Sequence, residues 1–223
     1  MCGRYTLQPG DKFYDRFDIE NRLETLTPRY NIAPGQMVPV VISKSPNRVV
    51  IMKWGLIPHW AKEEKIGYKM INARVETLGE KPSYRGSLKN KRCLVPASGF
   101  YEWQVTKLGK IPHYIHPDDN SLIAFAGLYD VWLKDGKEVY TFTIVTTNAN
   151  AFMKKIHDRM PVVLGRGKER QWLNKDLEDP SKALELLHDV GANALAEYEV
   201  SRKVNKPQND TPAVILPARK FIA

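Results

Sequence analysis

Cys2 is the residue with the clearest potential for chemistry, because of its place at the start of the chain. Initiator methionine is commonly removed when the next side chain is as small as that of cysteine. Loss of Met1 would leave an α-amine and a thiol on one carbon skeleton, with reference pKa values of about 7.7–8.0 and about 8.5. Such a 1,2-aminothiol condenses with an aldehyde to an imine, and its sulfur then closes a thiazolidine ring. The position of Cys2 therefore indicates an aldehyde-capturing group.

Two considerations bear on how reactive this group is. We expect nearby cations such as Arg4 to lower the pKa of the Cys2 thiol and so to increase the thiolate fraction near neutral pH. Position alone, however, favours a simpler interpretation, in which Cys2 is only a small residue that permits the removal of Met1.

Two further residues could move protons. His157 begins the segment HDRMP, and histidine exchanges protons near neutral pH. It could equally lie at a helix C-terminus and interact only with the helix dipole. Glu102 lies between two aromatic residues, and in an apolar pocket its pKa would rise and it could act as a general acid. An outward position on an alternating strand is at least as common for such a carboxylate.

Polar and aromatic residues elsewhere could form the floor of a site. In the segment INARVE, strand alternation would put Asn72, Arg74 and Glu76 on one face, which is either a solvated surface or a polar site. Trp54, Trp60 and Trp103 could stack on unpaired bases, although tryptophan lies more often in a core.

Composition and charge set the broad class. The chain has 223 residues with 43% hydrophobic and 26% charged residues, values typical of a soluble globular protein. Its net charge of +9 favours polyanionic partners, nucleic acid first. Residues 81–92 carry five cations and no acid, although such a run is more often a solvated loop or helix face.

Several functional classes are disfavoured by the same composition. Only two cysteines are present, far apart, which indicates neither a disulfide framework nor metal ligands. Cys93 lies in a short apolar run and is expected to be buried and inert. No signal peptide is apparent, and residues 122–129 are too few to cross a bilayer. We therefore expect a cytoplasmic protein without metal, cofactor or membrane contact.

The elements that must position these residues are mainly strands. Short segments rich in Val and Ile, separated by turn residues, predict strands at residues 37–43, 48–54, 99–103, 111–116, 122–133 and 138–145. An Asp-Gly pair within residues 134–137 predicts a hairpin turn. Helices are predicted at residues 11–17, at 149–156 after the possible cap Asn148, and at 181–190. The pattern predicts one α+β domain on antiparallel sheet, with a tail after Ser201 that packs back.

Ordered motifs along nearly the whole chain make it resemble the SRAP (SOS response-associated peptidase) family. The motifs are MCGR (1–4), YNIAP (30–34), WGLIP (54–58), INARVE (71–76), VPASGFYEW (95–103) and HDRMP (157–161). Two dipeptides near residue 205, Val200-Ser201 and Val204-Asn205, resemble the closing motif of the family. The resemblance implies a single domain over residues 1–223, built on a curved, barrel-like, mainly antiparallel sheet with peripheral helices and a basic groove.

The resemblance also implies a function. It implies covalent capture of abasic sites in single-stranded DNA. The protein would act as a monomer and would associate with the nucleoid when bound to DNA. The peptidase label would reflect the loss of Met1. By position, the catalytic residues would be Cys2, Asn72, Glu102 and His157. The DNA contacts would be Arg4, Pro34, Trp60, Arg74, Trp103 and Arg159.

A mechanism follows from these groups. His157 would help to open the closed sugar, the Cys2 amine would attack C1′, and Asn72 and Glu102 would orient the amine and handle protons. Thiolate closure would give the thiazolidine, while an imine left open would allow weak β-elimination lyase activity. Two other classes stay open: a cysteine peptidase using Cys2 and His157, and a non-covalent DNA-binding module in which Cys2 is incidental.

Overall fold

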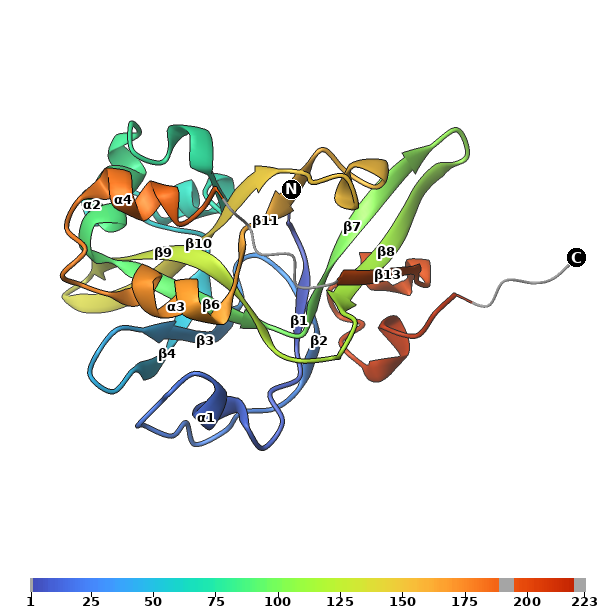
Figure 1. Cartoon of the computed structure of the whole chain (residues 1–223), viewed down its shortest axis with the longest axis horizontal. Coiled ribbons are helices and arrows are strands. Elements are labelled where there is room, and N and C mark those ends of the chain that lie inside the picture. Colours follow the sequence, from blue (N-terminus) through green and yellow to red (C-terminus); the bar gives the residue numbers. More distant parts are fainter. Residues whose placement is uncertain (1, 189–194, 219–223) are drawn as a thin grey trace, which may run out of the picture.

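A closed ring of strands forms one half of the molecule in the computed structural model, which describes residues 2–188 and 195–218 (Figure 1). Antiparallel pairing runs from β4 to β3, β6, β9 and β10, and a parallel pairing of β10 with β4 closes the ring. The bounds are β3 (Met37–Ile42), β4 (Arg48–Trp54), β6 (Arg92–Ala97), β9 (Ile123–Lys134) and β10 (Lys137–Asn148). Val and Ile side chains of these strands fill the main core, since β-branched residues pack well on a pleated surface.

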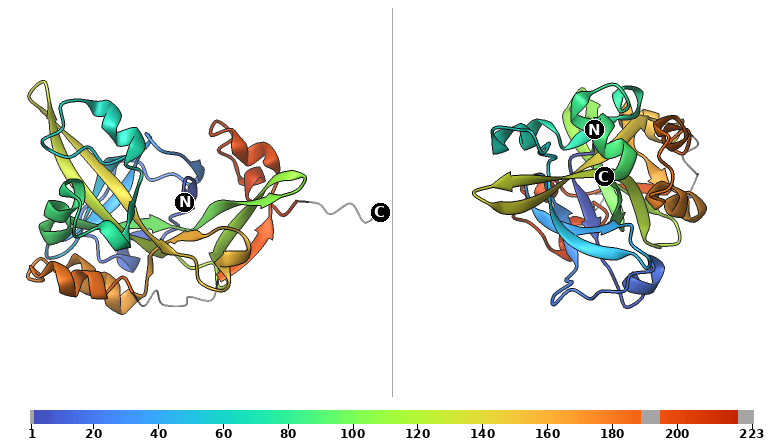
Figure 2. Two further views of the ribbon diagram at one scale, coloured as in Figure 1. Left: turned by 90° about the horizontal axis from the view of Figure 1, so that it is seen from above. Right: turned by 90° about the vertical axis from the view of Figure 1, so that its left-hand side faces the viewer.

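A second, open sheet leads away from the barrel and is antiparallel throughout (Figure 2). Its strands lie in the order β13 (Leu195–Glu199), β8 (Gly109–Pro117), β7 (Gly99–Thr106), β1 (Tyr5–Leu7) and β2 (Arg29–Ile32). Gly99 lets β7 approach β8 closely, because a Cβ there would lie 2.6 Å from the Ile115 carbonyl oxygen. These two sheets confirm the predicted fold class, an α+β fold on a curved, mainly antiparallel, barrel-like sheet.

Short helices and strands surround both sheets. The α-helices are α1 (Phe13–Arg16), α2 (Pro82–Asn90), α3 (Arg166–Leu173) and α4 (Pro180–Glu185). The 3-10 helices are η1 (Glu64–Lys69), η2 (Val75–Thr77), η3 (Met153–Lys155), η4 (Arg202–Asn205) and η5 (Pro212–Val214). The remaining strands are β5 (Asn72–Arg74), β11 (Arg159–Pro161) and β12 (Val163–Leu164). Among the described residues, no helix is both long and apolar enough to span a membrane.

The predicted helices were longer than the observed ones. The helix predicted at 149–156 is wrong: only η3 forms there, and Asn148 does not cap it. Instead Asn150 accepts a hydrogen bond from the Met153 backbone N–H, which tightens the chain into a turn. The helices predicted at 11–17 and 181–190 shorten to α1 and α4, and residues 189 and 190 lie outside the described part. Helices α2 and α3 were not predicted, because few apolar residues mark their buried faces.

Two smaller predictions are confirmed. Cys93 is fully buried on β6. The tail after Ser201 packs back, as Val204 and Val214 are buried in a small second core with Tyr101 and Tyr114 of the open sheet. This packing places the end of the described chain against the strands that carry the site.

Candidate active site

The N-terminal segment lies along β7 of the open sheet. Tyr5 pairs with Phe100, and one residue further the Tyr101 backbone N–H donates to the Arg4 carbonyl at 2.9 Å. Because the segment continues in this direction, Cys2 lies near the part of β7 that carries Glu102. The Cys2 side chain is fully buried.

Asn72 holds Cys2 from the other side. Its Nδ2 donates to the Cys2 carbonyl at 2.8 Å, a contact between residues 70 positions apart. Pairing of β5 with β10 fixes the backbone of Asn72, and the Tyr84 hydroxyl of α2 donates to the Asn72 carbonyl at 3.3 Å. Within the described residues, Asn72 Oδ1 is buried and has no hydrogen-bond partner, so it is an acceptor available for another donor.

Glu102 is a buried carboxylate, only 2% exposed, beside these groups. Burial raises the pKa of Glu102 above its ordinary value. The expectation of a buried Glu102 with a raised pKa therefore agrees with the structure. A carboxyl group of this kind keeps its proton to higher pH than a solvated glutamate and can donate it.

His157 faces the same cleft. It lies just after η3, and its Nδ1 accepts a hydrogen bond from the Arg159 backbone N–H at 3.0 Å. That bond leaves the ring proton on Nε2, where it can be donated. Glu102, His157, Trp103 and Asn205 line a cleft with a volume of about 540 Å³. The structure thus brings Cys2, Asn72, Glu102 and His157 together.

The expectation that the pKa of the Cys2 thiol would be lowered is wrong, although a hydrogen bond with the Arg4 backbone acts in that direction. Burial raises the pKa of the thiol far above its usual range, and the neighbouring Glu102 carboxylate raises it further. The Arg4 guanidinium instead donates to Asn31 Oδ1 and to the Val204 carbonyl, both at 2.7 Å. The thiol is accordingly neutral at physiological pH in this structure.

Arg4 and Trp103, two of the predicted DNA contacts, meet beside η4. The Arg4 guanidinium lies 5.8 Å from the Trp103 ring centroid, and Trp103 Nε1 donates to Asn205 Oδ1 at 2.8 Å. Both side chains are half-buried, so they combine a fixed position with an open surface. Asn205 belongs to the closing motif but was not predicted as a site residue.

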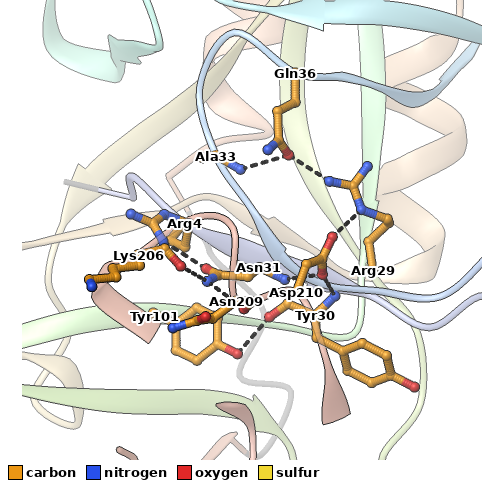
Figure 3. A network of polar contacts seen from close by, with 10 residues as sticks. All are labelled: Arg4, Arg29, Tyr30, Asn31, Ala33, Gln36, Tyr101, Lys206, Asn209 and Asp210. Atoms are coloured by element: carbon orange, nitrogen blue, oxygen red, sulfur yellow. Dashed lines mark hydrogen bonds and ion pairs between the residues drawn. The ribbon is translucent and has the colours of Figure 1, made fainter. Parts of the chain in front are cut away.

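A polar network around the buried side chain of Asn31 holds this arrangement together (Figure 3). The Asn31 side chain accepts from Arg4 and donates to the carbonyls of Val204, Lys206 and Asn209. The carboxylate of Asp210 accepts from the backbone N–H groups of residues 30 and 31 and from the Arg29 guanidinium. The motif YNIAP thus fastens the C-terminal segment beside Arg4, a role that sequence reasoning did not identify.

Arg159 is tightly engaged on β11. Its guanidinium makes two hydrogen bonds to the Glu76 carboxylate, at 2.6 and 3.0 Å, and further bonds to Asn148 Oδ1 and the Thr146 carbonyl. Because its backbone N–H also holds His157, Arg159 fixes the orientation of that ring.

The other predicted contacts lie at several places around the site. Pro34 is half-buried in the loop between β2 and β3, and Arg74 is exposed at the end of β5. Trp60 is 52% exposed and lines a separate hollow next to α2. The suggestion that Trp54 stacks on bases is wrong, because Trp54 is 1% exposed in the main core and donates to the Ile71 carbonyl.

Comparison with known proteins gives a consistent result. A family model described as SOS response associated peptidase (SRAP) matches residues 1–207. The Abasic site processing protein YoqW of Bacillus subtilis is 47% identical over 221 residues, which cover 96% of this chain and 99% of that protein. The Abasic site processing protein HMCES of Gallus gallus is 36% identical over 263 residues, covering 97% of this chain and 78% of that protein. A solved protein structure from Bacteroides thetaiotaomicron, 29% identical, superposes with a TM-score of 0.88 over 98% of this chain and 100% of that one.

Proposed function

The chain belongs to the SOS response associated peptidase family, and from this premise we propose that it captures abasic sites in single-stranded DNA as a covalent thiazolidine. The reacting group is the aminothiol of Cys2 after loss of Met1. The relatives named as abasic site processing proteins support the choice of substrate. The observation that carries the proposal is the position of Cys2: Asn72 donates to its carbonyl, and Glu102, which lines the cleft together with His157, is near enough for its charge to act on the thiol.

Opening of the sugar is the first step. An abasic deoxyribose is mostly a closed hemiacetal, and its ring oxygen must gain a proton as the ring opens to the aldehyde. The C1′ hydroxyl loses its proton as the ring oxygen gains one. The Nε2–H of His157 is suited to assist by donating a hydrogen bond to that oxygen, because the bond from Arg159 to Nδ1 keeps the ring hydrogen on Nε2.

Imine formation follows at the α-amine of Cys2. The amine adds to C1′, and one water molecule leaves as the imine forms. Asn72 Oδ1 is placed to accept an amine hydrogen, since Nδ2 of the same side chain holds the Cys2 carbonyl. Glu102 donates the proton that the departing hydroxyl requires, and its raised pKa keeps that proton bound to higher pH than in a solvated glutamate.

Ring closure completes the capture. The thiol of Cys2 adds across the C=N bond, so that sulfur bonds to C1′ and the thiol proton passes to nitrogen. A neutral, buried thiol suits this order of events, because the amine reacts first. An imine left open would undergo β-elimination and strand cleavage, so weak lyase activity is a side path.

DNA is positioned by the residues around the cleft. In this proposal Arg4, Pro34, Trp60, Arg74, Trp103 and Arg159 contact the strand as a monomer binds it. Arginines on flanking phosphates make the first encounter sensitive to salt, whereas the finished adduct resists it.

A denaturing gel tests the proposal. Purified protein is incubated with single-stranded DNA that carries one abasic site. We expect a band of reduced mobility that Cys2→Ala protein does not form, with more strand cleavage in that variant because it keeps an α-amine. Intact mass should show that Met1 is missing, and active protein that retains Met1 would refute the aminothiol mechanism.

The same assay separates the two other classes. Binding of the strand without any shifted band would favour a non-covalent DNA-binding module. Cleavage of an unrelated peptide in a Cys2-dependent manner would favour a peptidase acting on protein substrates.

A further inference from the structure

The basic segment of residues 81–92, which the site above does not use, divides into two kinds of cation. Arg92 is buried and donates to four backbone carbonyls, and Lys91 pairs with the buried carboxylate of Asp130. These two cations hold the fold. The other three cations are Lys81, Arg85 and Lys89, and all three are exposed. Within residues 2–188 and 195–218, none of them makes an ion pair or a side-chain hydrogen bond.

Helix α2 and its N-terminal flank arrange these three cations in a line. Arg85 and Lys89 lie one turn apart on the helix surface, and Lys81 is the N-cap residue, whose carbonyl accepts from the Arg85 backbone N–H, so the three cations follow one another along one side of the helix. Like charges at this spacing repel each other, and no acidic residue lies in residues 81–92 to offset them. Their separation, about 5–6 Å, is comparable to that of successive phosphates along an extended strand. This stripe therefore suits a polyanion.

A hollow of about 190 Å³ lies next to α2, on the side of the helix away from the three cations. Trp60 lines it and is 52% exposed, so part of its indole is open to a further contact. Gly86 and Asn90 line it from the helix, and a Cβ added to Gly86 would meet nothing within 4 Å. His59 donates through Nδ1 to Asp130 at 3.0 Å, which leaves its other ring nitrogen for a further partner. An aromatic wall with polar groups around it suits an unpaired base.

We propose that α2 extends the DNA surface beyond Trp60, which is already placed against the strand above, and binds the single strand running on from the abasic nucleotide. Phosphates of that strand lie along Lys81, Arg85 and Lys89, and one unpaired base stacks on Trp60 in the hollow. The helix adjoins the reacting cleft, because Tyr84 on its buried face donates to the Asn72 carbonyl. This inference rests on the proposed function and adds where the flanking strand runs.

Substrates of different length test the phosphate stripe. One oligonucleotide carries only a few nucleotides around the abasic site, and two others extend it by about ten nucleotides on the 5′ or the 3′ side, within the site size of single-strand grooves. We expect the variant Lys81→Ala/Arg85→Ala/Lys89→Ala to match the wild type on the short substrate. On one extended substrate its cross-linking rate constant should fall at least about tenfold. The slope of the logarithm of that constant against the logarithm of the salt concentration should be smaller by about 2.

A matched control removes the same charge elsewhere. The variant Lys44→Ala/Arg48→Ala/Lys175→Ala also loses three exposed cations and should match the wild type on every substrate. An equal loss in the control, a loss on the short substrate, or no loss on either extended substrate would overturn the proposal.

The hollow has its own pair of variants. Gly86→Leu fills the hollow from a helical position, whereas Gly86→Ala raises helix propensity without filling it. Replacing the bases of the extended substrate one by one with a baseless spacer should reveal one position that weakens wild-type and Gly86→Ala binding. Gly86→Leu protein should be insensitive to that position, and a sensitivity equal to that of the wild type would refute the base site.

Failure of the proposed covalent reaction can be distinguished from failure of the α2 proposal. The wild type would then form no covalent adduct with any substrate. Binding of the same strands, followed by fluorescence anisotropy, would still compare the variants and decide on the subsite.

Discussion

The closed barrel and the open sheet differ in what they bury. The barrel strands contribute large apolar side chains to the main core, such as Met52, Phe125 and Phe142, and closure leaves the ring without a free edge. The open sheet buries Asn31, Glu102 and His113, polar groups that lose hydration and require partners. It obtains several of these partners from the N-terminal segment and from the tail.

We infer from this difference that the barrel mainly provides stability and that the open sheet carries the reactive groups. Apolar packing in the closed ring resists unfolding, and charged groups that the barrel strands do bury, such as Arg92 and Asp130, are held by hydrogen bonds and an ion pair. In the open sheet the chain terminus, which leads into the inner strand β1, lies beside a carboxylate of raised pKa, as Cys2 and Glu102 show. The two regions should therefore respond differently to substitution.

Truncation in the barrel should have the largest effect on stability. Phe142 is fully buried and packs against Trp54 with ring centroids 6.3 Å apart. Phe142→Ala should lower the free energy of unfolding by about 3–5 kcal/mol, measured by urea denaturation. At a temperature where the variant is folded, its cross-linking rate should stay within about twofold of the wild type. A selective loss of cross-linking in folded Phe142→Ala protein would show that the barrel also contributes directly to the reaction.

Removal of the polar centre of the open sheet should cost less stability but more activity. Asn31→Ala leaves Arg4 and the carbonyls of residues 204, 206 and 209 without their partner. We expect a loss of about 2–3 kcal/mol in the free energy of unfolding. Amide hydrogen exchange should accelerate in residues 202–210, and DNA capture should slow. Unchanged exchange there would show that Asn31 does not fasten the tail.

Glu102→Gln should reveal the raised pKa through pH. The folded protein holds the Glu102 proton to higher pH than the unfolded chain, so folding takes up a proton between the two pKa values. The contribution of Glu102 to stability is therefore present below the ordinary glutamate pKa and falls as pH rises through the raised value. The variant should gain stability relative to the wild type across that window, as thermal unfolding at a series of pH values would measure. A difference independent of pH would contradict the assignment.

The smallest effect is expected at Arg159, where β11 joins the barrel strand β10. Glu76 is 44% exposed, so Glu76→Gln should change the free energy of unfolding by less than about 1 kcal/mol. Loss of the acidic partner frees the Arg159 charge, and binding of undamaged single-stranded DNA at low salt should tighten about threefold. Arg74→Gln, in the same segment, should weaken that binding instead. Equal weakening in both variants would exclude Arg159 from the DNA surface.

Much of the fold could be predicted because strand signals are local. The strand predicted at residues 48–54 coincides with β4, and the one at 37–43 is one residue longer than β3. Helix α2 escaped prediction because its buried face uses Tyr84, Ser87 and Leu88 amid charges. Whether a polar residue lies in a site or on a surface could not be predicted, since that depends on segments distant in the chain.

By itself, the sequence determined the chemical groups: an aminothiol at Cys2 once Met1 is lost, a carboxylate at Glu102 and an imidazole at His157. Its motifs also determined the family. Only the tertiary structure decided how these groups behave. Burial, a property of packing between distant segments, raises the pKa of the Cys2 thiol where a neighbouring arginine was expected to lower it. The same packing joins Asn72 to Cys2 across 70 positions, so that a small residue at the chain terminus becomes part of a site.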